Sequence, residues 1–266
     1  LNKLRRDCSY FMDKSTIVNY FRNQASSGDW ASLYDPNNVI SYPFIQRFIK
    51  TVALMKPVYG HVLDMGCGTG ILVKVTIDEG ASYTGFDLAP EMITACKLKF
   101  NEEISAGKAN FILADSSQFS SNKLFDQAIG MGYIEYFENP DFGIKQAHSW
   151  LKKEGKLILS FPHKNSIDYF TVCLLMPFRK LMTAITGKKT IKPDRKMWSQ
   201  NEAIALFKKH GFKEIQIVNY NVNLFHYPFS KLAPKLCNAF GALIENSFLS
   251  KISFFSTSFI ISAIKE

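Results

Sequence analysis

The sequence lacks the features that would indicate a metal site, a disulfide framework or a membrane span. Its five cysteines, at positions 8, 67, 96, 173 and 237, form no Cys-x-x-Cys pair and no other metal-ligand spacing. We therefore expect no metal site, and we expect a reducing, cytoplasmic compartment. No apolar run approaches the roughly 18 residues that a transmembrane helix needs. Membrane association therefore stays open only as contact with a surface.

The glycine-rich segment VLDMGCGTG, residues 62–70, lacks what two common nucleotide sites require. A phosphate-binding P-loop has a Lys followed by Ser or Thr after its last glycine, but Ile71 and Leu72 follow here. A dinucleotide site prefers the spacing G-x-G-x-x-G, whereas this chain has G-x-G-x-G with Asp64 two residues before it. A carboxylate at that position would repel a pyrophosphate and would suit a ligand with ammonium and sulfonium groups.

The pattern Val62-Leu63-Asp64-x-Gly-x-Gly-x-Gly resembles motif I of the class I S-adenosylmethionine (SAM) methyltransferases. The resemblance covers residues 59–166 and the order of elements beyond them. It implies an α/β fold with a doubly wound, mostly parallel seven-stranded sheet whose last strand is antiparallel. It also implies SAM as the cofactor. The apolar content of 47% agrees with a folded domain.

The next two predicted strands each end at an acidic residue that could contact the cofactor. Residues 82–93 predict a strand that ends at Asp87 and a helix that Pro90 opens. An acid about twenty residues beyond the glycine turn can accept both ribose hydroxyls. Residues 108–119 predict a third strand that ends at Asp115. In full, the resemblance implies cofactor contacts at Tyr34, Asp64, Gly66, Cys67, Gly68, Gly70, Asp87, Leu88, Asp115, Ser116, Gly130 and Met131.

Simpler roles stay open for some of these residues. Asp87 suits a helix N-cap, Asp115 suits a surface turn, and Cys67 suits a small filler within the glycine turn. Tyr20, Trp30 and Tyr34 are candidates to cover the methionine end of the cofactor, and Tyr34 is favoured because it lies in a loop-like segment beside Asp35-Pro36. Packing stays open for all three, since it is the commoner role of aromatic residues at helical spacing.

We expect an N-terminal helical cap at residues 1–56 and a SAM-binding core at residues 57–266. Residues 125–137 predict the fourth strand and its loop, and a turn at Gly155 precedes a fifth strand at 156–161. Two apolar, Lys-containing helical insertions follow the fifth and sixth strands, at about 166–196 and 224–255. They lie at the sheet edge that shapes the ligand crevice. Three roles stay open for them: a lid over a hydrophobic substrate, a peripheral membrane contact, and the interface of a homodimer.

The catalytic candidates come from the loops after the fourth and fifth strands. Because SAM carries an activated methyl group, the enzyme has mainly to orient the acceptor and exclude water, with a base for an O- or C-nucleophile. His163 is the leading base, followed by Glu135 and Tyr136, and His226 opens the second insertion. A packing or surface role stays open for each histidine.

The chain has 32 basic and 23 acidic residues, a formal charge of +9, but no signature of a nucleic-acid-binding module. It also lacks the Asn/Asp-Pro-Pro-Tyr motif of amino-group and nucleobase methyltransferases, so we expect no nucleic-acid substrate. We predict methyl transfer to a hydrophobic or amphipathic small molecule, with O-methylation favoured over N- or C-methylation. Two alternatives stay open: a SAM-binding regulatory protein without turnover, and an NAD-dependent oxidoreductase on the same fold.

Overall fold

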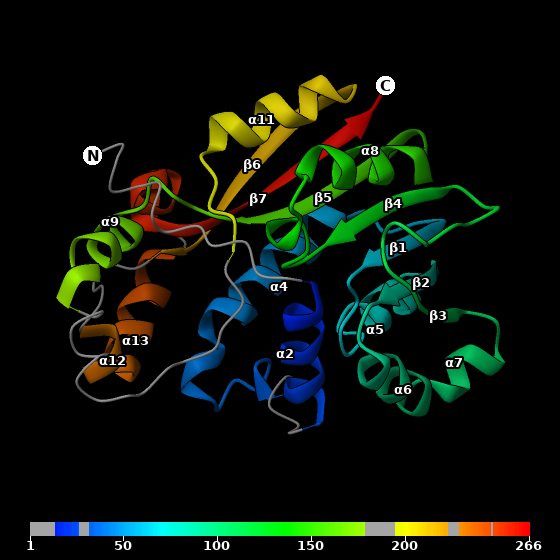
Figure 1. Ribbon diagram of the computed structural model, residues 1–266, viewed down its shortest axis with the longest axis horizontal. Coiled ribbons are helices and arrows are strands. Elements are labelled where there is room, and N and C mark those ends of the chain that lie inside the picture. Colours follow the sequence, from blue (N-terminus) through cyan, green and yellow to red (C-terminus); the bar gives the residue numbers. More distant parts are fainter. Residues whose placement is uncertain (1–13, 27–31, 179–194, 223–228, 246) are drawn as a thin grey trace.

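The computed structural model describes residues 14–26, 32–178, 195–222, 229–245 and 247–266. Its centre is a seven-stranded sheet with the order β3-β2-β1-β4-β5-β7-β6 (Figure 1). The first five strands pair in parallel, and β7 runs antiparallel to both β5 and β6. This topology confirms the predicted sheet. The strands are β1 (His61–Met65), β2 (Ser82–Asp87), β3 (Ala109–Leu113), β4 (Phe125–Gly130), β5 (Leu151–Pro162), β6 (Phe212–Val222) and β7 (Ser256–Lys265).

Helices cover both faces of the sheet, as a largely parallel sheet requires. One face carries α8 (Pro140–Trp150) and α11 (Gln200–Lys209), and the other carries α4 (Tyr42–Met55), α5 (Val73–Asp78) and α6 (Pro90–Lys99) (Figure 1). Successive side chains of a strand point to opposite faces. Val62 of β1 therefore joins the core beneath α4, α5 and α6, whereas Leu63 and Met65 join the core beneath α8 and α11.

Local sequence signals set most helix starts. Pro90 occupies the first turn of α6 as predicted, and a capping box between Ser199 and Glu202 starts α11. Within the expected helical cap, a short 3-10 turn, η1 (Val39–Ser41), precedes α4. The turn expected at Gly155 is a β-bulge instead. Glu154 has a φ of 61°, and the pairing with β4 shifts register there, so β5 starts directly after α8.

The N-terminal helices do not lie apart from the core. α2 (Lys14–Ser26) packs on α6, and α4 packs on β5, β6 and β7. The division into a cap and a core at residue 56 stays a prediction. Trp30 lies outside the described residues.

The two insertions meet at the β6–β7 end of the sheet. The first contributes α9 (Ile167–Leu174). The second contributes α12 (Phe229–Leu232), α13 (Pro234–Glu245), η3 (Phe248–Lys251) and η4 (Ser253–Phe255). Contacts run from α9 to η4, from η4 to η3, from η3 to α13 and from α13 to α12, so these elements form one continuous layer (Figure 1). Residues 179–194 and 223–228, with His226, lie outside the described part. Within that part, no helix is both long enough and apolar enough to cross a membrane.

Candidate functional site

The glycine turn after β1 brings backbone N–H groups to the carboxyl edge of the sheet. Gly66, Gly68 and Gly70 have φ values of 69°, 51° and 70°, in the left-handed region that favours glycine. At Gly70 a Cβ would also lie 2.7 Å from the Phe100 ring. The N–H groups of Gly66 and Cys67 donate to the carbonyl of Phe86 at 2.9 and 3.0 Å, which fastens the turn to β2. The Gly68 N–H is thereby directed at the end of β2.

The Asp87 carboxylate accepts a hydrogen bond from that N–H group. Gly68 N–H donates to Oδ2 and Ala89 N–H donates to Oδ1, both at 2.9 Å. Burial raises the pKa of the Asp87 carboxyl, and the backbone donors of Ala89 and Gly68 oppose that rise. Ala89 rather than Asp87 occupies the N-cap position of α6. The carboxylate is therefore held rigidly at the crevice, and each oxygen keeps acceptor capacity for a hydroxyl group.

Asp64 lies deeper, within β1. Tyr83 donates its hydroxyl hydrogen to Asp64 Oδ2 at 2.8 Å. Burial raises the pKa of Asp64 to about 7, and the negative charge of Asp87 adds to the rise, while the Tyr83 hydrogen bond and Arg47 oppose it. Asp64 lines a small annex beside the glycine turn together with Tyr34 and Cys67.

Arg47 of α4 is a buried cation beside this annex that we did not predict. Its Nη2 donates to the Tyr34 hydroxyl at 3.1 Å, and its guanidinium lies 5.3 Å from the centre of the Phe44 ring. A Cβ on Gly132 would lie 2.7 Å from Arg47 Nη1, so Gly132 leaves room for the charged group. Arg47 Nε finds no hydrogen-bond partner among the described residues. The available sequence signal was the spacing of Arg47, which shares one side of α4 with the buried Thr51, Leu54 and Met55.

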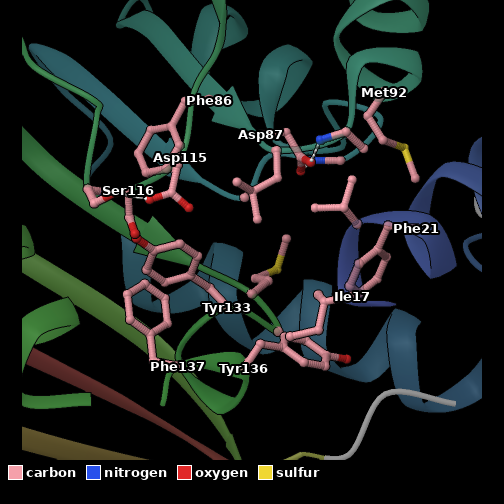
Figure 2. Close-up of a pocket in the computed structure, with 18 of the residues that line it drawn as sticks. Ile17, Phe21, Phe86, Asp87, Met92, Asp115, Ser116, Tyr133, Tyr136 and Phe137 are labelled. Atoms are coloured by element: carbon pink, nitrogen blue, oxygen red, sulfur yellow. Dashed lines mark hydrogen bonds between the residues drawn. The ribbon is translucent and has the colours of Figure 1, made fainter. Parts of the chain in front are cut away.

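A cavity of about 740 Å³ opens beside the glycine turn and is large enough for a cofactor with part of a second molecule. Figure 2 shows Asp87 and Asp115 on one side of it and the rings of Tyr133, Tyr136 and Phe137 on the other. Asp115 follows β3, and its Oδ1 accepts the Ser117 N–H at 2.7 Å. The predicted cofactor residues that line the cavity are Gly66, Gly68, Asp87, Leu88, Asp115, Ser116 and Met131.

The other predicted cofactor residues divide into two groups. Tyr34, Asp64 and Cys67 line the annex, which shares Gly66, Gly68 and Met131 with the main cavity. Gly70 and Gly130 line neither space. Both permit close packing instead: a Cβ on Gly130 would lie 2.7 Å from Leu159 Cδ2. Gly70 and Gly130 therefore affect the site through the backbone conformation and close packing that they allow, and not by lining it.

The apolar wall of the cavity includes residues that we did not predict. Ile17 and Phe21 project from α2 toward the cavity (Figure 2), and Val18 of the same helix also lines it. The Phe21 ring lies 5.4 Å from that of Tyr136 in an edge-to-face arrangement. The aromatic spacing of residues 20–35 indicated a covering segment, but only the packing of α2 on α6 shows which side faces the cavity.

The three catalytic candidates occupy different places. Tyr136 lines the cavity. Glu135 is 4% exposed and lies behind the wall, where Arg195 Nη1 is 3.7 Å from its Oε1. Burial raises the pKa of Glu135, and Arg195 and Arg47 oppose that rise.

His163 is 2% exposed and does not line the cavity. Its Nδ1 lies 3.2 Å from the Ser256 carbonyl, and its ring meets Phe259 edge-on at 5.4 Å. Burial lowers the pKa of His163, which favours a neutral ring. Among the described residues, no group of three or more His, Cys, Asp or Glu side chains could hold a metal ion.

The residues fit SAM. Asp87 presents acceptors for ribose hydroxyls, and Asp64 presents a carboxyl for an ammonium group. Arg47 is a cationic group whose Nε–H has no partner among the described residues and could donate to a ligand. The glycine turn provides bare backbone between them. The sheet order and this site define a class I SAM-dependent methyltransferase domain, with SAM as its cofactor.

Comparison with known proteins gives the family. A family model described as a methyltransferase domain matches residues 40–217, and the chain belongs to that family. Over 166 residues it is 27% identical to a ubiquinone biosynthesis O-methyltransferase of Pelagibacter ubique, covering 60% of this chain and 65% of the relative. Over 151 residues it is 31% identical to a malonyl-[acyl-carrier protein] O-methyltransferase of Acetivibrio thermocellus, covering 56% of this chain and 50% of the relative. The chain thus spans less than two thirds of either relative.

Solved structures share the fold at low sequence identity. The magnesium protoporphyrin IX methyltransferase of Synechocystis, with S-adenosylhomocysteine bound, is 17% identical with a TM-score of 0.63, covering 96% of this chain and all of that one. An N-methyltransferase of Bradyrhizobium japonicum, in complex with S-adenosylhomocysteine, is 13% identical with a TM-score of 0.58, covering 94% of this chain and 98% of that one.

Proposed function

We propose that the protein transfers the methyl group of SAM to a hydrophobic or amphipathic small molecule, by in-line displacement and with oxygen as the favoured accepting atom. The observation that carries this proposal is the two-sided cavity: carboxylates and glycine backbone on one side, and Phe21, Tyr136 and Phe137 on the other. An apolar wall opposite the cofactor side suits an acceptor with an apolar body. The relatives named as O-methyltransferases support oxygen as the accepting atom.

The chain's own residues would bind and orient the reactants. When bound, SAM supplies a methyl group already activated by a sulfonium. Asp87 would hold the ribose through oxygens fixed by two backbone N–H groups, while Asp64 and Arg47 would hold the charged methionine end. The apolar side chains of α2 would exclude water from the reacting atoms.

We further propose that Tyr136 contacts the acceptor, because it is the catalytic candidate that reaches the cavity. Burial raises the pKa of its hydroxyl, so the group is a hydrogen-bond donor at neutral pH. Glu135 lies behind it in contact with Arg195 and would position this loop. His163 would support the same region from the β5–β7 side. The cytoplasmic location and the homodimer stay predictions.

Turnover with methyl-labelled SAM against fractionated metabolite and lipid extracts tests this function. We expect label in an apolar fraction with the native protein, and much less label with Asp87→Asn when the SAM concentration is below the Kd of that variant. Label in a water-soluble fraction alone would contradict the hydrophobic acceptor. Binding of S-adenosylhomocysteine without turnover in every extract would favour the regulatory alternative.

A further inference from the structure

The helix α13 exposes its apolar side. Leu236 and Leu243 are 57% and 74% exposed, while Cys237, Gly241 and Glu245 face inward. The inward positions recur at intervals of four residues, so they form one side of the helix, and the leucines lie on the other. A surface helix ordinarily shows the reverse pattern, with its polar side in water.

The orientation of α13 is fixed by polar contacts beneath it. Glu245 accepts the N–H groups of Asn221 and Val222 at 3.2 and 2.8 Å, and the Tyr42 hydroxyl at 3.4 Å. At Gly241 a Cβ would lie 3.1 Å from that same hydroxyl, so the helix backbone sits directly against α4. Turning α13 to bury its leucines would remove these bonds and leave β6 N–H groups without their acceptor.

The exposed apolar side continues onto the neighbouring elements of the insertion layer. We define the apolar face by six exposed side chains: Phe170 and Leu174 of α9, Leu232 of α12, Leu236 and Leu243 of α13, and Phe248 of η3. The helices that carry them lie together at one end of the molecule (Figure 1). Exposed apolar side chains that gather on neighbouring elements are typical of an interaction surface.

The net positive charge of the two insertions indicates which kind of partner binds the apolar face. Residues 166–196 and 224–255 together contain ten Lys and Arg against three Asp and Glu, whereas the whole chain has 32 against 23. One of the three acids, Glu245, is buried on the inward side of α13. A second copy of the chain would bring a surface of the same sign, so like charges would oppose self-association. An anionic lipid surface complements both the apolar side chains and the positive charge.

We propose that the apolar face docks the protein peripherally on an anionic lipid bilayer. The leucines and phenylalanines enter the interfacial region, and the exposed Lys235 of α13 and Lys251 of η3 contact lipid headgroups. This inference does not depend on the identity of the methyl acceptor. It accounts for an outward apolar side that neither the cofactor site nor the cavity uses.

Vesicle co-sedimentation of the full chain tests the proposal. The triple variant Leu232→Gln, Leu236→Gln and Leu243→Gln keeps side-chain length and helix propensity while removing apolar contact. The matched control is Leu98→Gln on α6, because Leu98 is 76% exposed outside the apolar face. We expect native protein and Leu98→Gln to sediment with equimolar phosphatidylglycerol–phosphatidylcholine vesicles. We expect the triple variant to bind at least about tenfold more weakly.

Charge is tested separately. Binding to the mixed vesicles should fall as salt rises, and vesicles of phosphatidylcholine alone should bind less protein. Circular dichroism and the thermal response to S-adenosylhomocysteine check that the triple variant is folded. Native protein that stays in the supernatant, or a folded triple variant that binds like native protein, would overturn the proposal. So would a native dimer that the triple variant converts to monomer without any vesicle binding.

Discussion

At the residue scale, the charges around the glycine turn have distinct physical settings. Asp87 is held by two backbone N–H groups at the rim, Asp64 is buried within β1, and Arg47 reaches the same region from α4. A buried charge without compensation is unfavourable, so these groups depend on one another and on a polar ligand. Measurements of SAM affinity and of stability across pH therefore distinguish the roles of these residues.

Asp87→Asn is expected to weaken SAM affinity by roughly tenfold to a hundredfold, because it removes a charged acceptor for ribose hydroxyls while keeping the side-chain shape. Isothermal titration with SAM measures the change. Asp78→Asn, at the exposed end of α5, is the matched control and should bind as the native chain does. Unchanged affinity in a folded Asp87→Asn protein would remove the ribose role.

Asp64 should impose a pH dependence on the stability of the cofactor-free protein. Its folded-state pKa of about 7 lies above the ordinary value of 3.8, so between these two pH values the folded protein binds a proton that the unfolded chain releases. The free energy of unfolding should therefore fall as pH rises through this window, with a slope of at most about 1.4 kcal/mol for each step of one in pH, and level off above it. Denaturant unfolding across pH should show a shallower slope for Asp64→Asn, and an identical slope would contradict the assignment.

His163→Gln should lower stability, by about 1–3 kcal/mol, rather than turnover per folded molecule. The ring is buried, contacts the Ser256 carbonyl and packs on Phe259, so its loss disturbs the β5–β7 pairing. Urea unfolding measures the first quantity, and kcat/KM normalised to folded protein measures the second. Full stability with abolished turnover would instead support His163 as the base.

At the element scale, α2 and α13 show two uses of an apolar helix side. α2 turns Ile17, Val18 and Phe21 toward the cavity, whereas α13 turns its leucines outward. Phe21→Ala should weaken SAM affinity by roughly tenfold to a hundredfold, because the cavity loses an aromatic side chain whose burial is worth about 1.5–3 kcal/mol. Titration checks this, with Asn19→Ala on the exposed side of α2 as control. Equal affinities for the two variants would show that α2 does not cover the cofactor.

At the scale of the whole molecule, ligand binding should be visible as added stability. At a hundredfold excess over its Kd, a ligand adds about 2.7 kcal/mol, which corresponds to a Tm increase of roughly 5–10 °C for a chain of this size. We expect S-adenosylhomocysteine to give this increase and NADH to give none. The reverse pattern in a thermal-shift measurement would favour the oxidoreductase alternative.

Local chemistry explains which predictions were accurate. The glycine turn, the strand that ends at Asp87 and the helix that starts at Pro90 depend on neighbouring residues, so their pattern was visible in the sequence. The bulge at Glu154 was not predicted, because Gly155 suits a turn and a bulge equally and only pairing with β4 decides between them. Arg47 was missed for a related reason: its partners, Tyr34 and Gly132, are brought together only by packing.

The sequence by itself determined the sheet, the cofactor turn and its acids, because backbone conformation and strand-end position follow from local residue types. Only the tertiary structure decided which side chains share the cavity. It placed Tyr136 at the cavity and Glu135 and His163 behind its wall, and it directed α2 inward and the leucines of α13 outward. The physical reason is that the direction of a helix side depends on what lies beneath it. Beneath α13 lie β6 and the Tyr42 hydroxyl, which donate hydrogen bonds to Glu245 on the inward side of the helix.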